Sequence, residues 1–237
     1  MDARKAAGFT LIEIAIVLVV IGLLVGAVLT GQELIASARV RNLADSNAGI
    51  RSAYFAFVDH YRRIPGDWNA TEAGEALGVA VNGGGNDNGR IDNPSGSEWT
   101  EPNALWEQLA KAGFLQGEFA GDAVAPTPAN QRAPLNPFNR VMVLGWTDDY
   151  LHAGGTPPVR LNLVLGRGVP VDLARELDVK IDDGAPDTGA LRLTVSSGAT
   201  FGEAAEGEAG CVRTGGGGAL IYDIGTDSQD CNLTYLY

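Results

Sequence analysis

The stretch that decides the fold is GFTLIEIAIVLVVIGLLVGAVL at residues 8–29, an apolar run that contains one carboxylate, Glu13. From residue 6 to residue 32, Glu13 is the only charged residue. The 21 residues from 9 to 29 are long enough to cross a bilayer as a helix. Arg4 and Lys5 precede the run and favour retention of that end on the cytoplasmic side. A carboxylate inside such a span costs roughly 2.5–3.5 kcal/mol on insertion scales, so Glu13 needs an explanation.

Three interpretations of the run compete. A secretory signal peptide is favoured by the small residues ASA at 36–38, but the run is long for such a peptide and begins with an acid. A plain membrane anchor would hold Glu13 near the interface. In the third interpretation a peptidase cuts after Gly8, and the new amine of Phe9 in one subunit pairs with Glu13 of its neighbour. A buried charge is tolerated when it is paired, so the carboxylate becomes a reason for subunits to associate.

The hexapeptide GFTLIE at 8–13, with a basic leader before it, resembles the class III signal of type IV pilins and type II secretion pseudopilins. The resemblance implies that a prepilin peptidase cleaves after Gly8 and methylates the amine of Phe9. It also implies that Glu13 guides the subunit into a helical homo-oligomer. The expected function is therefore a structural pilin subunit of a type IV pilus-like extracellular filament, assembled through its N-terminal helix. Alternatives within the class are a pseudopilin of a type II secretion system and a minor pilin with a priming or adhesive head.

The resemblance also implies a location and partners. The subunit is expected in the bacterial inner membrane with its head in the periplasm, and then in an extracellular filament. Its expected partners are further copies of itself, the prepilin peptidase and the pilus or type II secretion assembly machinery. A protein of a different class, a membrane-anchored periplasmic binding or sensor domain, stays open as an alternative. Such an anchor would keep the leader that the peptidase removes from a pilin.

The chain divides by pattern into four segments. These are a leader at 1–8, a transmembrane or filament-core helix at 9–30, an amphipathic helix at 31–64 and a globular head at 65–237. No proline occurs before Pro65, which predicts one helix from residue 9 to about residue 63. An apolar seam runs along its second half at spacings of three and four: Ala36, Val40, Leu43, Asn47, Ile50, Tyr54, Phe57, Tyr61 and Ile64. We expect residues 50–64 to pack on the protein's own core and the earlier part to meet neighbouring subunits.

The head is predicted to be of the α+β class. Strands are expected at 141–146, 159–165, 191–195 and 219–224, and helices at about 103–112 and 171–177. The predicted architecture is a long N-terminal helix, hydrophobic and then amphipathic, packed on an antiparallel sheet, which is a pilin-like fold. The segments LAKAGFL and PLNPFNR also resemble the middle region of pilins and major pseudopilins.

The only two cysteines, Cys211 and Cys231, close a 21-residue loop near the end of the chain. In an exported region they can form a disulfide, and in a reducing cytosol they would be two free thiols. The resemblance favours the disulfide, because pilins often staple the C-terminal loop in this way. On the chain-entropy model such a bond stabilises the head by roughly 3 kcal/mol.

Charge and motifs exclude several other functions. The net charge of −12 argues against general nucleic-acid binding, which needs a basic surface. The run GGGG at 215–218 lacks the lysine of a phosphate loop, and the two histidines, His60 and His152, are isolated in sequence. No nucleophile motif of the GxSxG type occurs. We therefore expect a protein that is not an enzyme.

Calcium is the one cofactor considered, and it is motivated by the resemblance more than by the loops themselves. The stretch NDNGRID at 86–92 partly matches an EF-hand loop, although Gly84 and Ser95 stand where strong ligands are expected. The acidic turn DDGAPDTG at 182–189 is a second candidate, with an ordinary tight turn as its alternative. The candidate ligands are Asn86, Asn88, Asp92, Asp182, Asp183 and Asp187.

Overall fold

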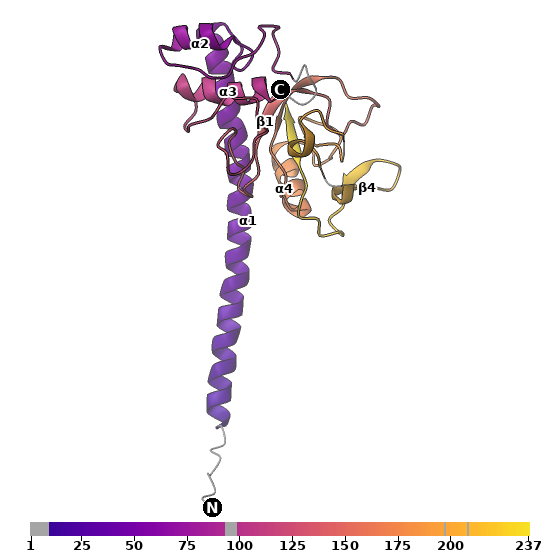
Figure 1. The fold of residues 1–237 in the computed structure, drawn as a ribbon. Helices are drawn as coiled ribbons and strands as arrows, with labels where there is room; N and C mark the ends of the chain where they lie inside the picture. The colour runs from indigo at the N-terminus through magenta and orange to yellow at the C-terminus, as the bar shows by residue number, and fades with distance from the viewer. Residues whose placement is uncertain (1–9, 93–98, 197, 208) are drawn as a thin grey trace, which may run out of the picture. The chain divides into compact units, whose positions relative to one another are not determined.

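The computed structural model describes residues 10–92, 99–196, 198–207 and 209–237 (Figure 1). The chain divides into two compact units, with the division between Arg39 and Val40. The helices are α1 (Leu11–Tyr61), α2 (Ala70–Leu77), α3 (Thr100–Lys111) and α4 (Val171–Ile181). The strands are β1 (Val143–Thr147), β2 (Arg160–Val164), β3 (Leu191–Leu193), β4 (Val212–Thr214), β5 (Leu220–Tyr222) and β6 (Leu233–Leu236). Two short 3₁₀ turns cover Gly202–Ala204 and Ala209–Cys211.

The first part of α1 is a helix whose aliphatic side chains are uncovered. All the large hydrophobic residues from Leu11 to Leu29 are exposed. Among the described residues, α1 is the one helix that is long and apolar enough to cross a membrane. An apolar surface of this extent needs a membrane or other protein around it.

The second part of α1 belongs to the head unit, and its burial begins earlier than expected. Val40 and Leu43 are 2% and 0% exposed, as fully buried as Ile50 and Phe57 further along. The expectation that only residues 50–64 pack on the protein's own core is therefore wrong. The physical reason is that the seam keeps its spacing of three and four back to Val40, so the same face of the helix stays turned toward the head.

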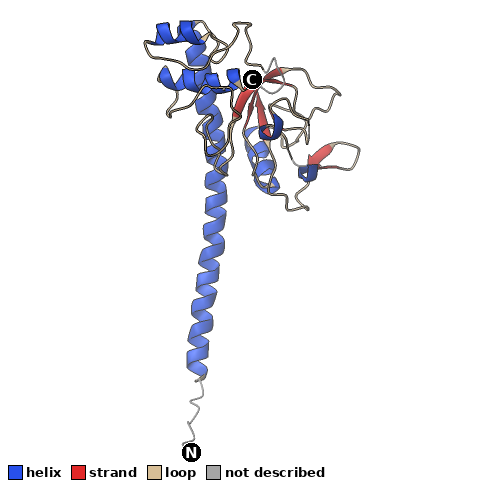
Figure 2. Ribbon diagram, viewed as in Figure 1, coloured by secondary structure: helices blue, strands red, loops and turns tan. Residues whose placement is uncertain are grey.

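The head contains a four-stranded antiparallel sheet in the order β1-β2-β6-β3 (Figure 2). Trp146 lies opposite Leu161, Leu163 opposite Tyr235, and Leu191 opposite the same Tyr235. The predicted α+β class with an antiparallel sheet is confirmed. β6, close to the end of the chain, was not expected, and it lies between β2 and β3.

Helix α3 organises the loops of the head through buried polar side chains. Glu101, Asn103, Glu107 and Gln108 are each at most 3% exposed. Glu107 accepts hydrogen bonds from the backbone N–H groups of Asn82 and Gly83 and from Lys111 Nζ at 2.6 Å. These bonds satisfy backbone N–H groups of a loop, which have no partner in a helix or strand. An irregular segment can be buried only when such groups are satisfied in this way.

Two other side chains of α3 act in the same way. Gln108 accepts from Gly66 N at 2.9 Å and donates to the carbonyl oxygens of Trp68 and Gly83. Glu101 accepts from Asp92 N at 2.9 Å, and burial raises the pKa of this carboxyl to about 7. α3 therefore fixes the glycine-rich segment that follows α2.

Aromatic side chains join the end of α1 to the neighbouring segments. Phe57 lies 6.2 Å from Trp68 and 5.9 Å from Phe114 between ring centroids. Figure 1 shows α2 and α3 beside this end of the helix. At the other end of the sequence, Tyr237 Oη donates to Asn47 Oδ1 at 2.7 Å, so the C-terminal residue is held against α1.

Candidate assembly site at the start of α1

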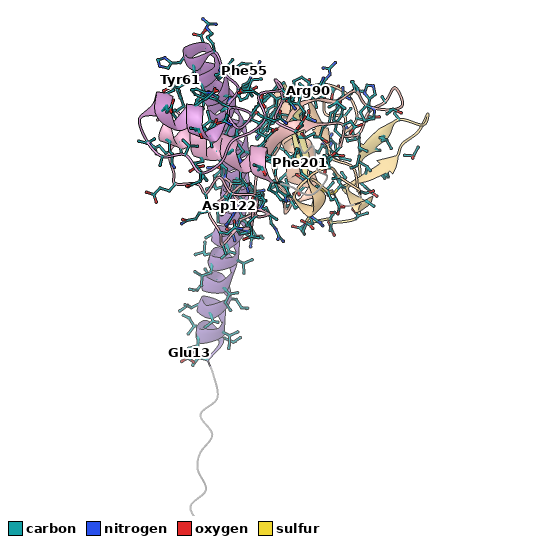
Figure 3. All side chains as sticks on the ribbon, turned by 45° about the horizontal axis from the view of Figure 1, so that its top comes forward. Glu13, Phe55, Tyr61, Arg90, Asp122 and Phe201 are labelled. Carbon is teal, nitrogen blue, oxygen red and sulfur yellow. A yellow bond between two sulfur atoms is a disulfide. The ribbon has the colours of Figure 1, made fainter. Side chains whose placement is uncertain are left out.

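The glutamate of the apolar run is bonded to the residue that precedes the helix. Thr10 donates to Glu13 Oε2 from its backbone N and from its hydroxyl, both at 2.8 Å. In return Glu13 N donates to Thr10 Oγ1 at 3.3 Å. Both residues are exposed, and Figure 3 shows Glu13 at the beginning of the described helix.

This arrangement is a capping box. Thr10 is the N-cap and Glu13 stands three positions later, so each side chain satisfies a backbone N–H that the helix leaves unpaired. The pattern TLIE at 10–13 is the sequence signal for such a box, and it makes Thr10 a functional residue that motif reasoning about Glu13 alone overlooks. The box uses Oε2, whereas Oε1 of Glu13 accepts no hydrogen bond from the described residues.

The predicted processing residues, Gly8 and Phe9, lie outside the described residues. Cleavage after Gly8 and the pairing of the Phe9 amine with Glu13 therefore stay predictions.

Further along the run, glycines make a smooth helix surface. A Cβ placed at Gly22 or Gly26 would meet nothing within 4 Å. No contact in the described part of the chain thus requires glycine at these positions. Glycines four residues apart let two helices approach closely, and so they favour contact with another helix.

At the far end of the chain Cys211 and Cys231 form a disulfide, with their Cα atoms 5.7 Å apart. The predicted pairing is confirmed. The bond joins the residue before β4 to the segment that leads into β6. β4 and β5 pair only with each other in the described sheets, so this hairpin is attached to the main sheet largely through its neighbours.

Three carboxylates converge at the C-terminal end of α4 and in the turn that follows it. Asp178, Asp182 and Asp183 each offer an oxygen within 4.8 Å of the others. Asp178 is fully buried, and the other two are exposed. Asp187, predicted as a ligand with Asp182 and Asp183, is buried and is not part of this group.

A buried phenol lies close to this group. Tyr235 is 4% exposed, and its hydroxyl has no hydrogen-bond partner among the described residues. Burial raises the pKa of Tyr235, and the charges of Asp178 and Asp182 raise it further.

In the other predicted calcium loop the side-chain oxygens are engaged locally. Asn86 Oδ1 accepts from Asn88 N at 3.0 Å, and Asn88 Oδ1 accepts from Arg90 N at 2.9 Å. Asp92 Oδ2 accepts from Asn88 Nδ2 at 3.2 Å, while its Oδ1 is buried without a partner in the described structure. Ser95 lies outside the described residues. Both calcium sites stay predictions.

The fold and the helix start together define an α+β head on a helix whose N-terminal part is apolar and capped by Thr10 and Glu13. Comparison with protein families then adds the motif. Residues 3–29 match the family described as prokaryotic N-terminal methylation motif, which is the class III prepilin signal of type IV pilins and pseudopilins. The resemblance identified from GFTLIE is thereby confirmed. Comparison with the curated proteins and with the solved structures gave no match.

The motif carries consequences for the class of protein. It supports the type IV pilin or pseudopilin class, whose members are structural subunits, and it implies processing by a prepilin peptidase and assembly by pilus or secretion machinery. The apolar helix and the motif fit anchoring in a membrane before assembly.

Proposed function

We propose that this chain is the structural subunit of a type IV pilus-like extracellular filament. The observation that carries the proposal is Glu13, held at the start of an uncovered apolar helix inside a prepilin signal. In a simple anchor the acid would only cap the helix, at the cost of placing a charge next to the membrane core. In an array of identical helices it has a natural partner, because each processed subunit brings a new amine at Phe9.

The capping box supports this pairing. Glu13 uses Oε2 for its own Thr10, which lowers the cost of holding the carboxylate in an apolar environment before assembly. Oε1 then accepts the amine of the neighbouring subunit. A charge-assisted bond of this kind in a water-free core is strong, and it fixes the axial register of one helix against the next.

The same proposal places the protein in the cell. The subunit first resides in the inner membrane with its head in the periplasm, and the prepilin peptidase removes residues 1–8. The assembly machinery then transfers the helix at 9–30 into a homopolymer whose surface is formed by the head at 65–237. Assembly and not catalysis is its role.

Within the pilin class, we favour a pilus over a secretion pseudopilus because the head of 173 residues is large for a major pseudopilin. A minor pilin that primes the filament or carries an adhesive head is the next candidate. A type II secretion pseudopilin would share the helix and the processing but would not form a filament on the cell surface.

We also propose calcium as a ligand of the head. The convergence of Asp178, Asp182 and Asp183 supports this site over the loop at 86–92, where no such group of carboxylates forms among the described residues. Carboxylate oxygens are ligands that calcium prefers, and calcium tolerates more varied geometry than the strict octahedron of magnesium.

The experiment is coexpression of the full chain with a prepilin peptidase, followed by intact-mass spectrometry. We expect a mature chain of 229 residues that begins with N-methylated Phe9. The matched control is Gly8→Asp, which should retain residues 1–8. A wild-type chain that keeps its leader beside an active peptidase would favour the membrane-anchored binding domain instead. Electron microscopy of the producing cells then separates a surface pilus from a periplasmic pseudopilus.

A further inference from the structure

A cavity of about 380 Å³ opens on the surface of the head. It lies between the loop at 126–128, the segment after β2 and the residue before Cys231. Its lining residues are Pro126, Thr127, Pro128, Arg140, Val141, Arg167, Ala204 and Asp230. The volume is that of a small-molecule site, which begins at about 300 Å³.

Arg140 gives this cavity a positive charge that nothing in the described structure neutralises. The head from residue 65 onward contains 10 basic and 24 acidic residues, and half of its basic residues form an ion pair with an acid. Lys111, Arg132, Arg167, Lys180 and Arg213 each form an ion pair. Among the described residues Arg140 forms none, although acids outnumber bases in the head as a whole. A free guanidinium at a cavity is therefore a candidate anion-binding group.

The neighbouring carboxylate of the cavity is already committed. Asp230 Oδ2 accepts from Arg167 Nε at 2.9 Å and also from Arg167 Nη2, while Oδ1 accepts from Gly168 N at 2.8 Å. The positive charge of Arg167 therefore neutralises the negative charge of Asp230. Of the three charged residues that line the cavity, only Arg140 then lacks an ion-pair partner among the described residues.

A single buried amide fixes the backbone of both arginines. Asn136 is 5% exposed, and its Oδ1 accepts from Arg140 N at 3.0 Å. Its Nδ2 donates to the carbonyl oxygen of Arg167, also at 3.0 Å. The stem of Arg140 lies over Gly168, where an added Cβ would come 3.4 Å from Arg140 Cγ. The backbone of the charged wall is thus fixed before a ligand binds, and the exposed guanidinium of Arg140 is the group that a ligand would order.

The opposite wall is rigid and offers one free hydroxyl. Thr127 N donates to Asn130 Oδ1 at 2.9 Å, and Asn130 Nδ2 donates to Ala125 O at 2.8 Å, so the loop closes on itself. Arg132 and Asp122 brace the loop further through two bonds of 2.5 and 2.6 Å. The hydroxyl of Thr127 has no hydrogen-bond partner in the described part of the chain. Pro126 and Pro128 flank it with rigid apolar rings.

We propose that this cavity binds a carboxylate-bearing sugar, such as one uronic acid unit of an acidic glycan. The carboxylate would pair with the Arg140 guanidinium, whose planar fork matches it. The sugar hydroxyls would bond to Thr127, and the C–H face of the ring would pack on the prolines. The apolar walls and the hydroxyl groups favour a sugar over a bare inorganic anion. This activity goes beyond filament assembly and needs only the head of one subunit.

The test is isothermal titration of the full chain in detergent micelles with glucuronate, glucose, acetate and inorganic phosphate. We expect saturable binding of glucuronate and much weaker binding of the other three. Arg140→Gln should weaken glucuronate binding by about tenfold or more, the loss of one charge-assisted contact. Thr127→Val should weaken it to a smaller degree. The control is Arg175→Gln, which removes an exposed arginine on α4 that does not line the cavity and should leave binding unchanged.

Thermal melting of each variant shows that a loss of binding is not a loss of folding. Equal binding of glucuronate by Arg140→Gln and by the wild type would overturn the assignment of the carboxylate to Arg140. Phosphate or acetate binding as tightly as glucuronate would overturn the assignment of a sugar. An absence of saturable glucuronate binding to the folded wild type would overturn the site altogether.

Discussion

Tyr222 donates a hydrogen bond to the buried carboxylate of Asp178, with 2.6 Å between Tyr222 Oη and Asp178 Oδ2. The two side chains are 4% and 0% exposed, and they join the β4–β5 hairpin to α4. Burial is the main reason that the pKa of Asp178 rises to about 6, and the charges of Asp183 and Asp182 add to it. The bond to Tyr222 opposes the rise but does not cancel it.

The first prediction is that Asp178 makes the head less stable as the pH rises. Its pKa is higher in the folded chain than the ordinary value of 3.8, so folding favours the protonated form. The contribution to stability is full below pH 4 and is lost as the pH rises through 6. The shift corresponds to about 3 kcal/mol at 1.36 kcal/mol per pKa unit. Asp178→Asn, which can still bond to Tyr222 and Gly184, should remove this part of the pH dependence and stabilise the protein at pH 8.

Urea unfolding of the full chain in detergent at pH 5 and pH 8 measures about half of this contribution, roughly 1.4 kcal/mol, because the pKa of about 6 lies only one unit above pH 5. Asp172→Asn is the matched control, because Asp172 is an exposed carboxylate on the same helix. It should keep the wild-type difference between the two pH values. A pH difference in Asp178→Asn as large as in the wild type would exclude Asp178 as its source.

The second prediction concerns the disulfide. Replacing Cys211 and Cys231 together by serine should lower the free energy of unfolding by roughly 3 kcal/mol, because the 21-residue loop is then unconstrained in the unfolded chain. The hairpin should loosen first, since it pairs with no strand of the main sheet. Hydrogen exchange should therefore speed up in residues 212–222 more than in residues 143–164. A uniform increase across both regions would contradict the local role of the bond.

Much of this fold could be predicted because its signals are local. The apolar run fixed the helix to within a few residues, and alternation in residues 159–165 located β2. β6 was missed because its sequence, LTYL, ends with two apolar residues in succession and does not keep a strict alternation of apolar and polar residues. It is also only four residues long, and its partners lie some 40 and 70 residues earlier in the chain.

The candidate sites also differ in whether a local sequence signal reveals them. Glu13 could be found from sequence because a charge in an apolar run is conspicuous by itself. Asp178 could not be assigned to the acidic turn, because α4 was expected to end at residue 177 and in fact continues to Ile181. The cavity at Arg140 depends on residues between 126 and 230, and only tertiary structure brings them together.

The third prediction tests the capping box. Thr10→Val keeps the shape of the side chain but removes the hydroxyl that bonds to Glu13 in both directions. Loss of such a cap costs about 1 kcal/mol, and it leaves Oε2 of Glu13 less satisfied in the membrane. We expect fewer filaments from Thr10→Val, wild-type numbers from Thr10→Ser and almost none from Glu13→Ala. Filaments are counted by electron microscopy after mass spectrometry shows equal processing. If Thr10→Val assembled as many filaments as the wild type, the capping box would not be needed for assembly.

The last prediction is that calcium binds the acidic group and does so better at higher pH. A cation and a proton compete for Asp178, whose pKa of about 6 keeps it partly protonated at mild acidity. Extracellular calcium modules bind with dissociation constants of about 0.1–1 mM, and tenfold excess over the constant would stabilise the folded chain by about 1.4 kcal/mol. Millimolar calcium should thus raise the melting temperature of the full chain in detergent more at pH 8 than at pH 5, and magnesium should raise it less.

Variants of the acidic turn separate this site from a general effect of charge. Asp183→Asn should remove most of the calcium-dependent rise, because Asp183 is an exposed member of the converging group. Asp187→Asn should keep the rise, because Asp187 lies outside the group although the sequence alone favoured it. Asp183 also accepts bonds from Ala185 N and Thr188 Oγ1, so each variant is compared with itself, with and without calcium. If the wild type melts at the same temperature in calcium and in chelator, the acidic turn is an ordinary turn whose oxygens are satisfied by its own backbone.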